Sequence, residues 1–411
     1  MQASLSCRLF APLHRSVLAH SSLPLLAKRH YRNPALVEPA LGETGAYTQE
    51  HGVFSHSSWV NHDSIHYFRD DVTGLKAIVG IHDTLLGPAL GGCRLYNYKN
   101  ETEALNDVLR LSRGMTFKAA CAGLPLGGGK SVVIGPPPAD PDERGGFFRR
   151  FGMFIDSLGG NYVAAEDIGV SVSDMVHIRA MTEWVAGIPT EMGGSGNPAP
   201  YTAHGVYLGM KQAVLHKHDT DSLSGMRILV EGLGSVGYLL AKKLHNEGAE
   251  LIVCDVNELK VQKALDKFGC KSVPLDYRFD EKFDIYSPNA LGGTITAEMI
   301  PKLSCSIVAG AANNQLVDDQ MANLLMERDI LYVPDFVLNA GGLINVSLEK
   351  DPDGWSEDRA VRKLSGIATN LEDIFTQSAR RQISTLDSAI RLAVHRLSRT
   401  AYRRGCKKDF W

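Results

Sequence analysis

Residues 230–238 read VEGLGSVGY, and this stretch decides the fold. It carries the pattern G-x-G-x-x-G directly after an apolar run at 227–231 that is typical of a buried strand. Gly232 permits a tight turn, Gly234 lets a pyrophosphate approach the backbone, and Gly237 lets the next helix pack closely on the strand. The free N–H groups at the start of that helix favour an anion. The pattern therefore predicts a dinucleotide-binding turn between a strand and a helix.

An acidic residue follows at the spacing that such a turn requires. Asp255 comes directly after the next predicted strand, at 251–254. A carboxylate in this place accepts hydrogen bonds from the ribose hydroxyls and repels a 2′-phosphate, so we expect NAD rather than NADP. The residues predicted to contact the cofactor here are Gly232, Leu233, Gly234, Ser235, Val236, Gly237, Tyr238 and Asp255.

Outward from this turn, short apolar strands alternate with helical periods. Further strands are predicted near 284–286, 306–309 and 331–333, and repeated strand–helix units of this kind favour a doubly wound parallel sheet. Upstream, a helical period begins after Asn100, and Gly114 is expected to end it. The segment 187–200 is rich in glycine and proline and resembles a hinge between domains. A chain of 411 residues is long enough for two domains.

Composition excludes several classes of protein. The net charge of −3 gives no reason to expect nucleic acid as a partner, and no apolar run reaches the roughly 18 residues that span a membrane. The seven cysteines include no C-x-x-C pair, which fits a reducing compartment and no disulfide framework. The histidines between 51 and 66 lack accompanying ligands, so no metal site is predicted.

The first 37 residues differ from the rest. They contain arginines and serines and no acidic residue before Glu38, which is the composition of an organellar transit peptide. We expect the mitochondrial matrix as the destination. A disordered tail or a wrongly assigned start is the alternative, and the protein would then be cytoplasmic.

A second glycine-rich stretch, GLPLGGGKSVVIG at 123–135, raises the question of a phosphate-binding loop. The pattern G-x-x-x-x-G-K-[ST] needs a glycine where Leu124 stands, and a helix where a short β-branched run ends in prolines. We therefore expect a glycine loop that presents the amine of Lys130, followed by a strand.

Together these stretches resemble the Glu/Leu/Phe/Val dehydrogenase family, the oxidative deaminases of amino acids, and within it the leucine dehydrogenases. The resemblance covers about residues 60–400. It rests on LGPALGGCR (86–94), SRGMTFKAACAGLPLGGGKSVVIG (112–135), AEDIGVSVSDM (165–175), GSGNPAPYTAHGVYLGM (194–210), GLGSVG (232–237), AGAANNQL (309–316) and PDFVLNAGGLINV (334–346).

The resemblance implies an α/β protein of two domains. The N-terminal substrate domain would contain a mixed sheet and the C-terminal domain a Rossmann-type doubly wound parallel sheet. It also implies a homo-oligomer, and octamers occur among leucine dehydrogenases. We expect a transit peptide at 1–37, a substrate-binding and dimerisation domain at 50–199, a Rossmann domain at 200–345, and C-terminal helices at 346–411 that pack back on the first domain.

The resemblance also implies roles for particular residues. Lys130 would activate water, Asp167 would exchange a proton with the substrate nitrogen, and Lys118 would hold the substrate carboxylate. A lysine titrates near about 10.4, and burial beside a second cation lowers that value, so a neutral amine is attainable at such a site. The residues expected to face the nicotinamide ribose and carboxamide are Thr202, Ala312, Asn313 and Asn314.

The substrate is inferred from two positions at the presumed side-chain pocket. Members that act on glutamate have a lysine where Leu90 precedes Gly91 and Gly92, and a small hydroxyl residue where Leu343 stands. A buried carboxylate without partners is unfavourable, so glutamate is disfavoured. Branched-chain L-amino acids are expected, converted reversibly to 2-oxo acids and ammonia. The alternatives are an aromatic amino acid dehydrogenase, phenylalanine being the nearest rival substrate, or a non-catalytic NAD-binding relative.

Overall fold

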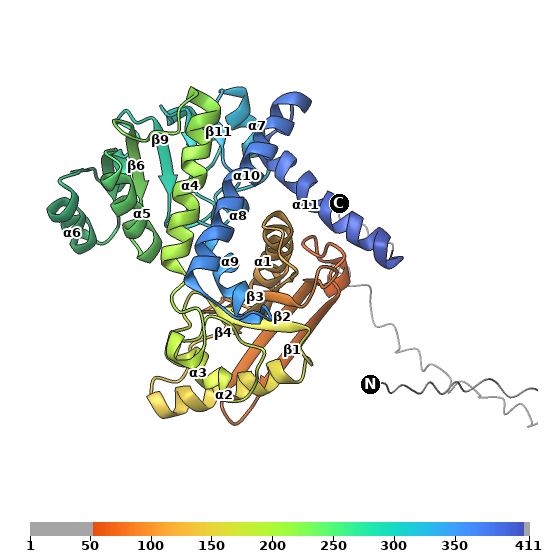
Figure 1. Cartoon of the computed structure of the whole chain (residues 1–411). Coiled ribbons are helices and arrows are strands. Elements are labelled where there is room, and N and C mark those ends of the chain that lie inside the picture. Colours follow the sequence, from red (N-terminus) through yellow and green to blue (C-terminus); the bar gives the residue numbers. More distant parts are fainter. Residues whose placement is uncertain (1–51, 407–411) are drawn as a thin grey trace, which may run out of the picture. The chain divides into compact units, whose positions relative to one another are not determined.

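A computed structural model of the chain describes residues 52–406 (Figure 1). The predicted transit segment at 1–37 lies outside this part. Two β-sheets organise the described residues, one in each half of the chain. Among the helices of this part, none is long and apolar enough to cross a membrane.

The N-terminal sheet has five strands in the order β1-β2-β4-β3-β5. Its antiparallel pairs are β1 with β2 and β2 with β4, and its parallel pairs are β4 with β3 and β3 with β5, so the sheet is mixed. The strands are β1 (Ser64–Asp70), β2 (Leu75–Asp83), β3 (Ala89–Tyr96), β4 (Gly127–Ile134) and β5 (Tyr162–Glu166).

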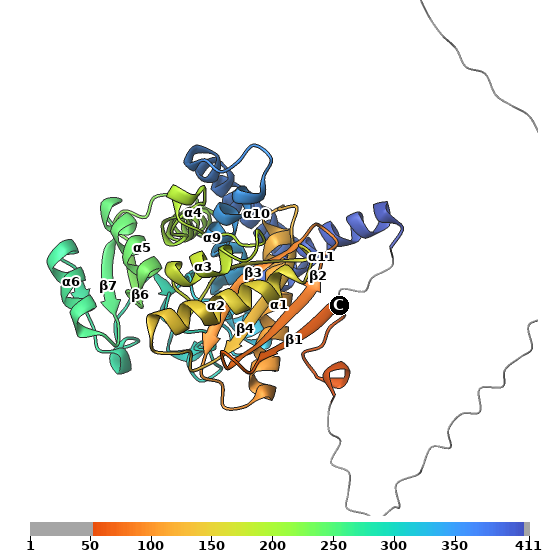
Figure 2. The same cartoon turned by 90° about the horizontal axis from the view of Figure 1, so that it is seen from below.

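Helices cover both faces of this sheet because its central strands are apolar on both sides. Ile78 and Val132 pack on α1 (Glu101–Cys121), whereas Ala77 and Val79 pack on α2 (Pro141–Asp156). Figure 2 shows α2 and the short α3 (Val172–Arg179) beside the strands. Strands covered on both faces are buried along most of their length, as β2 and β4 are.

The C-terminal sheet has six strands in the order β11-β10-β9-β6-β7-β8, and every pair is parallel. The order turns back at β6, the strand that precedes the glycine turn, and this is where open parallel sheets bind ligands. The strands are β6 (Arg227–Glu231), β7 (Glu250–Cys254), β8 (Lys271–Ser272), β9 (Ile285–Pro288), β10 (Ile307–Val308) and β11 (Leu331–Tyr332).

The remaining α-helices follow residue 198, whereas the 3₁₀ turns occur along the whole described part of the chain. The α-helices are α4 (Ala199–His218), α5 (Ser235–Asn246), α6 (Glu258–Phe268), α7 (Gln320–Glu327), α8 (Asp335–Leu338), α9 (Gly341–Ser347), α10 (Glu357–Arg381) and α11 (Thr385–Arg404). The 3₁₀ turns are η1 (Val53–Ser55), η2 (Thr190–Met192), η3 (Leu275–Tyr277), η4 (Ile300–Lys302) and η5 (Leu348–Lys350).

The last helix returns to the first half of the chain. Cys121 Sγ at the end of α1 lies 3.4 Å from the carbonyl oxygen of Ala389 on α11, and Arg396 Nη1 donates to the carbonyl oxygen of Ala120 at 3.0 Å. The two-domain α/β class, with a mixed and a parallel sheet, is confirmed. The domain boundaries placed on the sequence stay a prediction.

Two local expectations were wrong. Helix α1 was expected to end at Gly114, but it continues to Cys121, because buried Thr116, Phe117 and Ala120 extend its apolar face. Lys130 was expected on a loop, but it lies inside strand β4 together with the glycines before it.

Candidate active site

The glycines before Lys130 belong to β4 because neighbouring elements approach the strand too closely for side chains. A Cβ at Gly128 would lie 2.0 Å from the backbone nitrogen of Thr116 on α1, and one at Gly129 would lie 2.7 Å from the Tyr162 ring on β5. Close packing of α1 and β5 on β4 therefore requires glycine here. The Lys130 side chain that follows is 8% exposed, so the amine is held among neighbours rather than in solvent.

Strand β3 supplies a second pair of glycines beside the same amine. A Cβ at Gly91 would lie 1.7 Å from the carbonyl oxygen of Gly129. A Cβ at Gly92 would lie 2.7 Å from Asp167 Cβ and 2.9 Å from Lys130 Nζ. Gly92 thus leaves open the space in which Lys130 and Asp167 meet.

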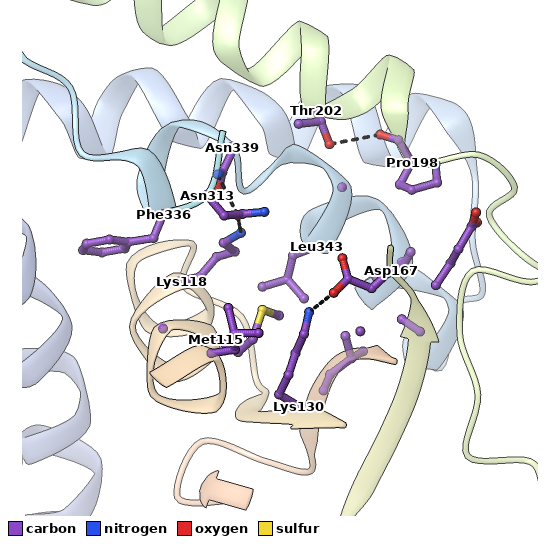
Figure 3. Close-up of a pocket in the computed structure, with 18 of the residues that line it drawn as sticks. Met115, Lys118, Lys130, Asp167, Pro198, Thr202, Asn313, Phe336, Asn339 and Leu343 are labelled. Carbon is purple, nitrogen blue, oxygen red and sulfur yellow. Dashed lines mark hydrogen bonds and ion pairs between the residues drawn. The ribbon is translucent and has the colours of Figure 1, made fainter. Parts of the chain in front are cut away.

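Lys130 and Asp167 form a buried ion pair. Asp167 directly follows β5, and its Oδ2 lies 2.5 Å from Lys130 Nζ (Figure 3). Burial acts to raise the pKa of Asp167, but the charges of Lys130 and Arg94 outweigh it and hold the pKa at about 2. The carboxylate is therefore ionised at neutral pH.

Arg94 is a site residue that the sequence analysis did not single out. Its Nε lies 3.2 Å from Asp167 Oδ2, and its Nη1 lies 3.1 Å from Asp107 Oδ2 on α1. Strand alternation could have revealed it, because Leu90, Gly92 and Arg94 of β3 share one face.

Lys118 reaches the site from the last turn of α1. Its Nζ donates to Asn313 Oδ1 at 3.2 Å, and the same oxygen accepts from Asn339 Nδ2 at 2.9 Å. Burial lowers the pKa of Lys118 to about 8, and the positive charge of Lys130 acts in the same direction, whereas the negative charge of Asp335 acts to raise it. Burial raises the pKa of Asp335, although the hydrogen bond that this carboxylate accepts from the Gln315 N–H acts to lower it.

These groups line one cavity of about 270 Å³. Figure 3 shows the two lysines and Asp167 around it, with Leu343 between them. The predicted site residues in its wall are Leu90, Gly92, Lys118, Lys130, Asp167, Thr202, Val236, Asn313, Asn314 and Leu343. The wall residues that we did not predict include Arg94, Met115, Asp335, Phe336 and Asn339.

Helical spacing could have identified part of this missing set. Met115 precedes Lys118 by three residues on α1, and Asn339 lies four residues after Asp335, so the members of each pair face the same way.

The glycine turn after β6 has the shape that a dinucleotide needs. Gly232 has a φ of 93°, which favours glycine, and a Cβ at Gly237 would lie 2.0 Å from the Gly232 carbonyl oxygen. A Cβ at Gly234 would meet no atom within 4 Å, so this side of the turn is open. Asp255 closes the other side, because its Oδ2 accepts from the Leu233 N–H at 2.6 Å.

The remaining predicted cofactor residues are placed as follows. The Thr202 hydroxyl on α4 donates to the carbonyl oxygen of Pro198 at 3.2 Å. Ser235 is exposed and Ala312 is buried outside the cavity wall. The Tyr238 ring packs on Phe268, away from the cavity. Leu233 is buried in the hydrophobic core, so the side chains of Leu233 and Tyr238 both point away from the cavity.

A parallel sheet with an open glycine turn, together with a second domain that brings two lysines and an aspartate to one cavity, defines a pyridine-nucleotide-dependent dehydrogenase. Residues 60–184 match the family description "Glu/Leu/Phe/Val dehydrogenase, dimerisation domain", and residues 254–405 match "Glutamate/Leucine/Phenylalanine/Valine dehydrogenase". The chain belongs to this family and is an amino acid dehydrogenase.

Relatives with different substrates resemble the chain to a similar degree. Leucine dehydrogenase of Bacillus subtilis (strain 168) is 46% identical over 84% of this chain and 94% of its own. Phenylalanine dehydrogenase of Lysinibacillus sphaericus is 44% identical over 80% of this chain and 87% of its own. The crystal structure of L-tryptophan dehydrogenase from Nostoc punctiforme has a TM-score of 0.71 at 39% identity, covering 83% of this chain and 97% of the other.

Proposed function

We propose that the protein catalyses the reversible, NAD-dependent oxidative deamination of branched-chain L-amino acids, leucine first, to 2-oxo acids and ammonia. One observation carries the proposal: Lys118, Lys130 and Asp167 line the same cavity as the apolar side chains of Leu90 and Leu343. Charged groups for an amino acid backbone and apolar groups for its side chain are thus present together.

Each of the three charged groups has a separate proposed role, which follows from its position in the cavity. The ammonium of Lys118, at the end of α1, would bind the substrate carboxylate in place of the Asn313 amide oxygen that it contacts now. Asp167 is ionised and so could take a proton from the substrate nitrogen. Lys130 Nζ, next to that carboxylate, would activate the water that attacks the iminium carbon.

The cofactor would be held by the glycine turn, with Asp255 at the ribose. Bound there, NAD would supply the acceptor for the hydride that leaves the substrate Cα. The acidic side chain supports NAD over NADP, because a 2′-phosphate beside it would be repelled. Changing Asp255 to Asn keeps an oxygen for the Leu233 N–H. This change should raise the kcat/KM ratio of NADP to NAD at least about tenfold, and an unchanged ratio would contradict the assignment.

The apolar wall supports a branched-chain substrate. Neither Leu90 nor Leu343 can pair with a side-chain carboxylate, and Leu343 is only 7% exposed. An aromatic substrate is the second candidate, because the phenylalanine-specific relative is nearly as similar to this chain as the leucine-specific one.

Reduction of NAD, followed by absorbance with a panel of amino acids, tests the proposal. Leucine, isoleucine and valine should be oxidised in preference to phenylalanine, tryptophan and glutamate. Preference for an aromatic substrate would support the second candidate, and no turnover of any would support a non-catalytic relative.

Lys130→Ala separates catalysis from cofactor binding, because it should abolish turnover and leave NAD binding intact. Lys271→Ala is the control. It removes a lysine that is 58% exposed and pairs with Glu281 outside the cavity wall, and it should leave turnover unchanged. Turnover by Lys130→Ala would overturn the role of this lysine.

We also propose that the protein forms a homo-oligomer, with an octamer as the form to test. The match of residues 60–184 to a dimerisation domain supports this proposal, and light scattering of the purified protein tests it.

We further propose import into the mitochondrial matrix. The acid-free composition of residues 1–37 supports this proposal, and imaging of residues 1–37 fused to a fluorescent protein tests it.

A further inference from the structure

Asp167 contacts two cations through one oxygen. Its Oδ2 lies 2.5 Å from Lys130 Nζ and 3.2 Å from Arg94 Nε. The two cations come from neighbouring strands, β4 and β3. A single cation would be enough to compensate one carboxylate, so the second calls for an explanation.

Arg94 is fixed from its other side. Its Nη1 contacts both oxygens of Asp107, at 3.1 and 3.4 Å, and Tyr98 donates to Asp107 Oδ2 at 2.6 Å. Asp107 lies on α1 and Tyr98 lies between β3 and α1. The guanidinium therefore bridges two carboxylates and has little freedom to leave Asp167.

The two cations differ in chemistry. An arginine stays charged at any pH that proteins encounter, whereas a lysine can give up its proton. The proposed function, on which this inference rests, requires Lys130 to be uncharged when it activates water. At that moment Arg94 is the other cation in contact with the Asp167 carboxylate among the described residues. A buried carboxylate that lacked a cation would take up a proton.

We propose that Arg94 is a positioning residue that keeps Asp167 ionised and in place while Lys130 is uncharged. Because Arg94 keeps its positive charge at every pH that proteins encounter, Lys130 can lose its proton without Asp167 becoming protonated. Asp107 and Tyr98 support this role by holding the guanidinium.

Other groups around Asp167 do not replace Arg94. Besides Lys130 and Arg94, the titratable groups that feel the charge of Asp167 are Lys118 on α1, Cys93 on β3, Tyr162 and Glu166 on β5, and Tyr98. Lys118 is the further cation of this set, and its amine contacts Asn313 instead. Burial raises the pKa values of Cys93, Tyr162, Glu166 and Tyr98, and none of these groups can become a cation, so none can compensate the charge of the Asp167 carboxylate.

The first experiment needs no activity. The infrared absorption of protonated carboxylic acids is titrated with pH, and the Asp167 contribution is isolated by subtracting an Asp167→Asn variant. In Arg94→Gln, Asp167 should become protonated at a pH at least about one unit higher than in the wild type. Arg94→Lys should restore at least half of that shift, because it restores charge but not the forked geometry.

The second experiment measures kcat/KM for leucine as a function of pH. The acid limb of the profile should move to higher pH in Arg94→Gln and return towards the wild type in Arg94→Lys. Arg144→Gln is the matched control, because it removes another partly buried arginine that pairs with an aspartate, Asp174, in the same sheet domain but outside the cavity. It should leave the limb unchanged.

If Arg94→Gln lowers the rate equally at every pH, and neither the infrared titration nor the acid limb of the pH profile moves, the proposal is overturned and Arg94 is a structural residue. If Arg94→Gln does not fold, Asp107→Asn is used instead, because it loosens the same guanidinium. It should shift the infrared titration and the acid limb in the same direction by a smaller amount, and the absence of a shift would overturn the proposal. A wild-type protein without amino acid turnover would contradict the proposed function, whereas the infrared shift would still decide the role of Arg94.

Discussion

Lys118 Nζ donates a 3.2 Å hydrogen bond to Asn313 Oδ1, a residue 195 positions later in the chain. The bond joins the last turn of α1 to the loop after β10 across the cavity (Figure 3). The amide oxygen of Asn313 is a neutral acceptor, and a substrate carboxylate is a stronger one. We therefore propose that a substrate carboxylate takes the position now occupied by Asn313 Oδ1.

This contact leads to a prediction about pH. The pKa of Lys118 is lowered to about 8, so the side chain loses its charge as the pH rises above that value. The proposed role of Lys118 requires its charged form to bind the substrate carboxylate. The KM for leucine should therefore rise by up to about tenfold per pH unit above pH 8. Initial-rate measurements across this range check it.

Lys118→Arg is the control for this effect. An arginine keeps its charge over the whole range, so the KM of this variant should not rise with pH in the same way, whatever its absolute value. An equally steep rise in the arginine variant would show that another group causes the effect.

The second prediction concerns Gly92. Its missing side chain leaves the space in which Lys130 and Asp167 meet, and a Cβ would lie 2.7 Å from Asp167 Cβ. Gly92→Ala must displace the ion pair, and small displacements of reacting groups can lower kcat about 100-fold. Steady-state kinetics together with a thermal melt would show loss of activity in a folded protein.

Gly366→Ala is the matched control for the glycine substitution. Gly366 lies within α10, where a Cβ would meet no atom within 4 Å. Alanine in a helix is favoured over glycine by roughly 1 kcal/mol, so this variant should be slightly more stable and equally active. If Gly92→Ala retained full activity, the close approach at β3 would have no role in catalysis.

The sequence predicted those features that depend on local spacing. The turn at Gly232 was predicted because its three glycines lie within the six consecutive residues 232–237, between a strand and a helix, and Gly232 does have a φ of 93°. The resemblance to the dehydrogenase family, which is confirmed, predicted that Lys118, Lys130 and Asp167 share one site. That the three line one cavity is a finding of the structure.

Features that depend on contacts between distant segments were not predicted. The partner of Arg94, Asp167, is 73 positions away, so no local pattern could pair them. Lys130 was assigned to a loop because three glycines normally interrupt a strand, whereas the close approach of Thr116 and Tyr162 makes glycine necessary there. Gly114 did not end α1, because burial of the following turn outweighs the low helix propensity of one glycine.

The third prediction concerns substrate size. Leu343 on α9 is nearly buried and faces the cavity (Figure 3). Leu343→Val removes one methylene from the wall, and such a change alters discrimination by about 10- to 200-fold. The kcat/KM ratio of phenylalanine to leucine should therefore rise at least about tenfold.

Leu338→Val tests whether that change is specific to the wall. Leu338 lies on the neighbouring helix α8, is fully buried and does not line the cavity. The substitution should lower stability by about 1 kcal/mol and leave the substrate ratio unchanged. The same shift in both variants would assign it to general loosening rather than to the pocket.

The last prediction concerns Glu349, which fastens the segment that we interpreted as a hinge. Its Oε1 accepts from the N–H of Gly187 at 2.8 Å, from the N–H of Ser195 at 2.7 Å, and from the Ser195 hydroxyl. Glu349 follows α9, the helix that carries Leu343, and Gly187 lines the cavity. One carboxylate thus ties one wall of the cavity to the helix that forms another.

Glu349→Ala leaves two backbone N–H groups without this acceptor, and each such loss costs about 1–3 kcal/mol. We expect the free energy of unfolding in urea to fall by about 2–4 kcal/mol, and the KM for leucine to rise because Gly187 is no longer held. Glu349→Gln keeps a carbonyl oxygen and should lose less than half as much. Glu372→Ala, on the exposed face of α10, should change stability by no more than about 0.5 kcal/mol. If Glu349→Ala and Glu372→Ala were equally stable, the three hydrogen bonds would not hold the segment, and its position would have to depend on the packing of Val185 and Ile188 in the core.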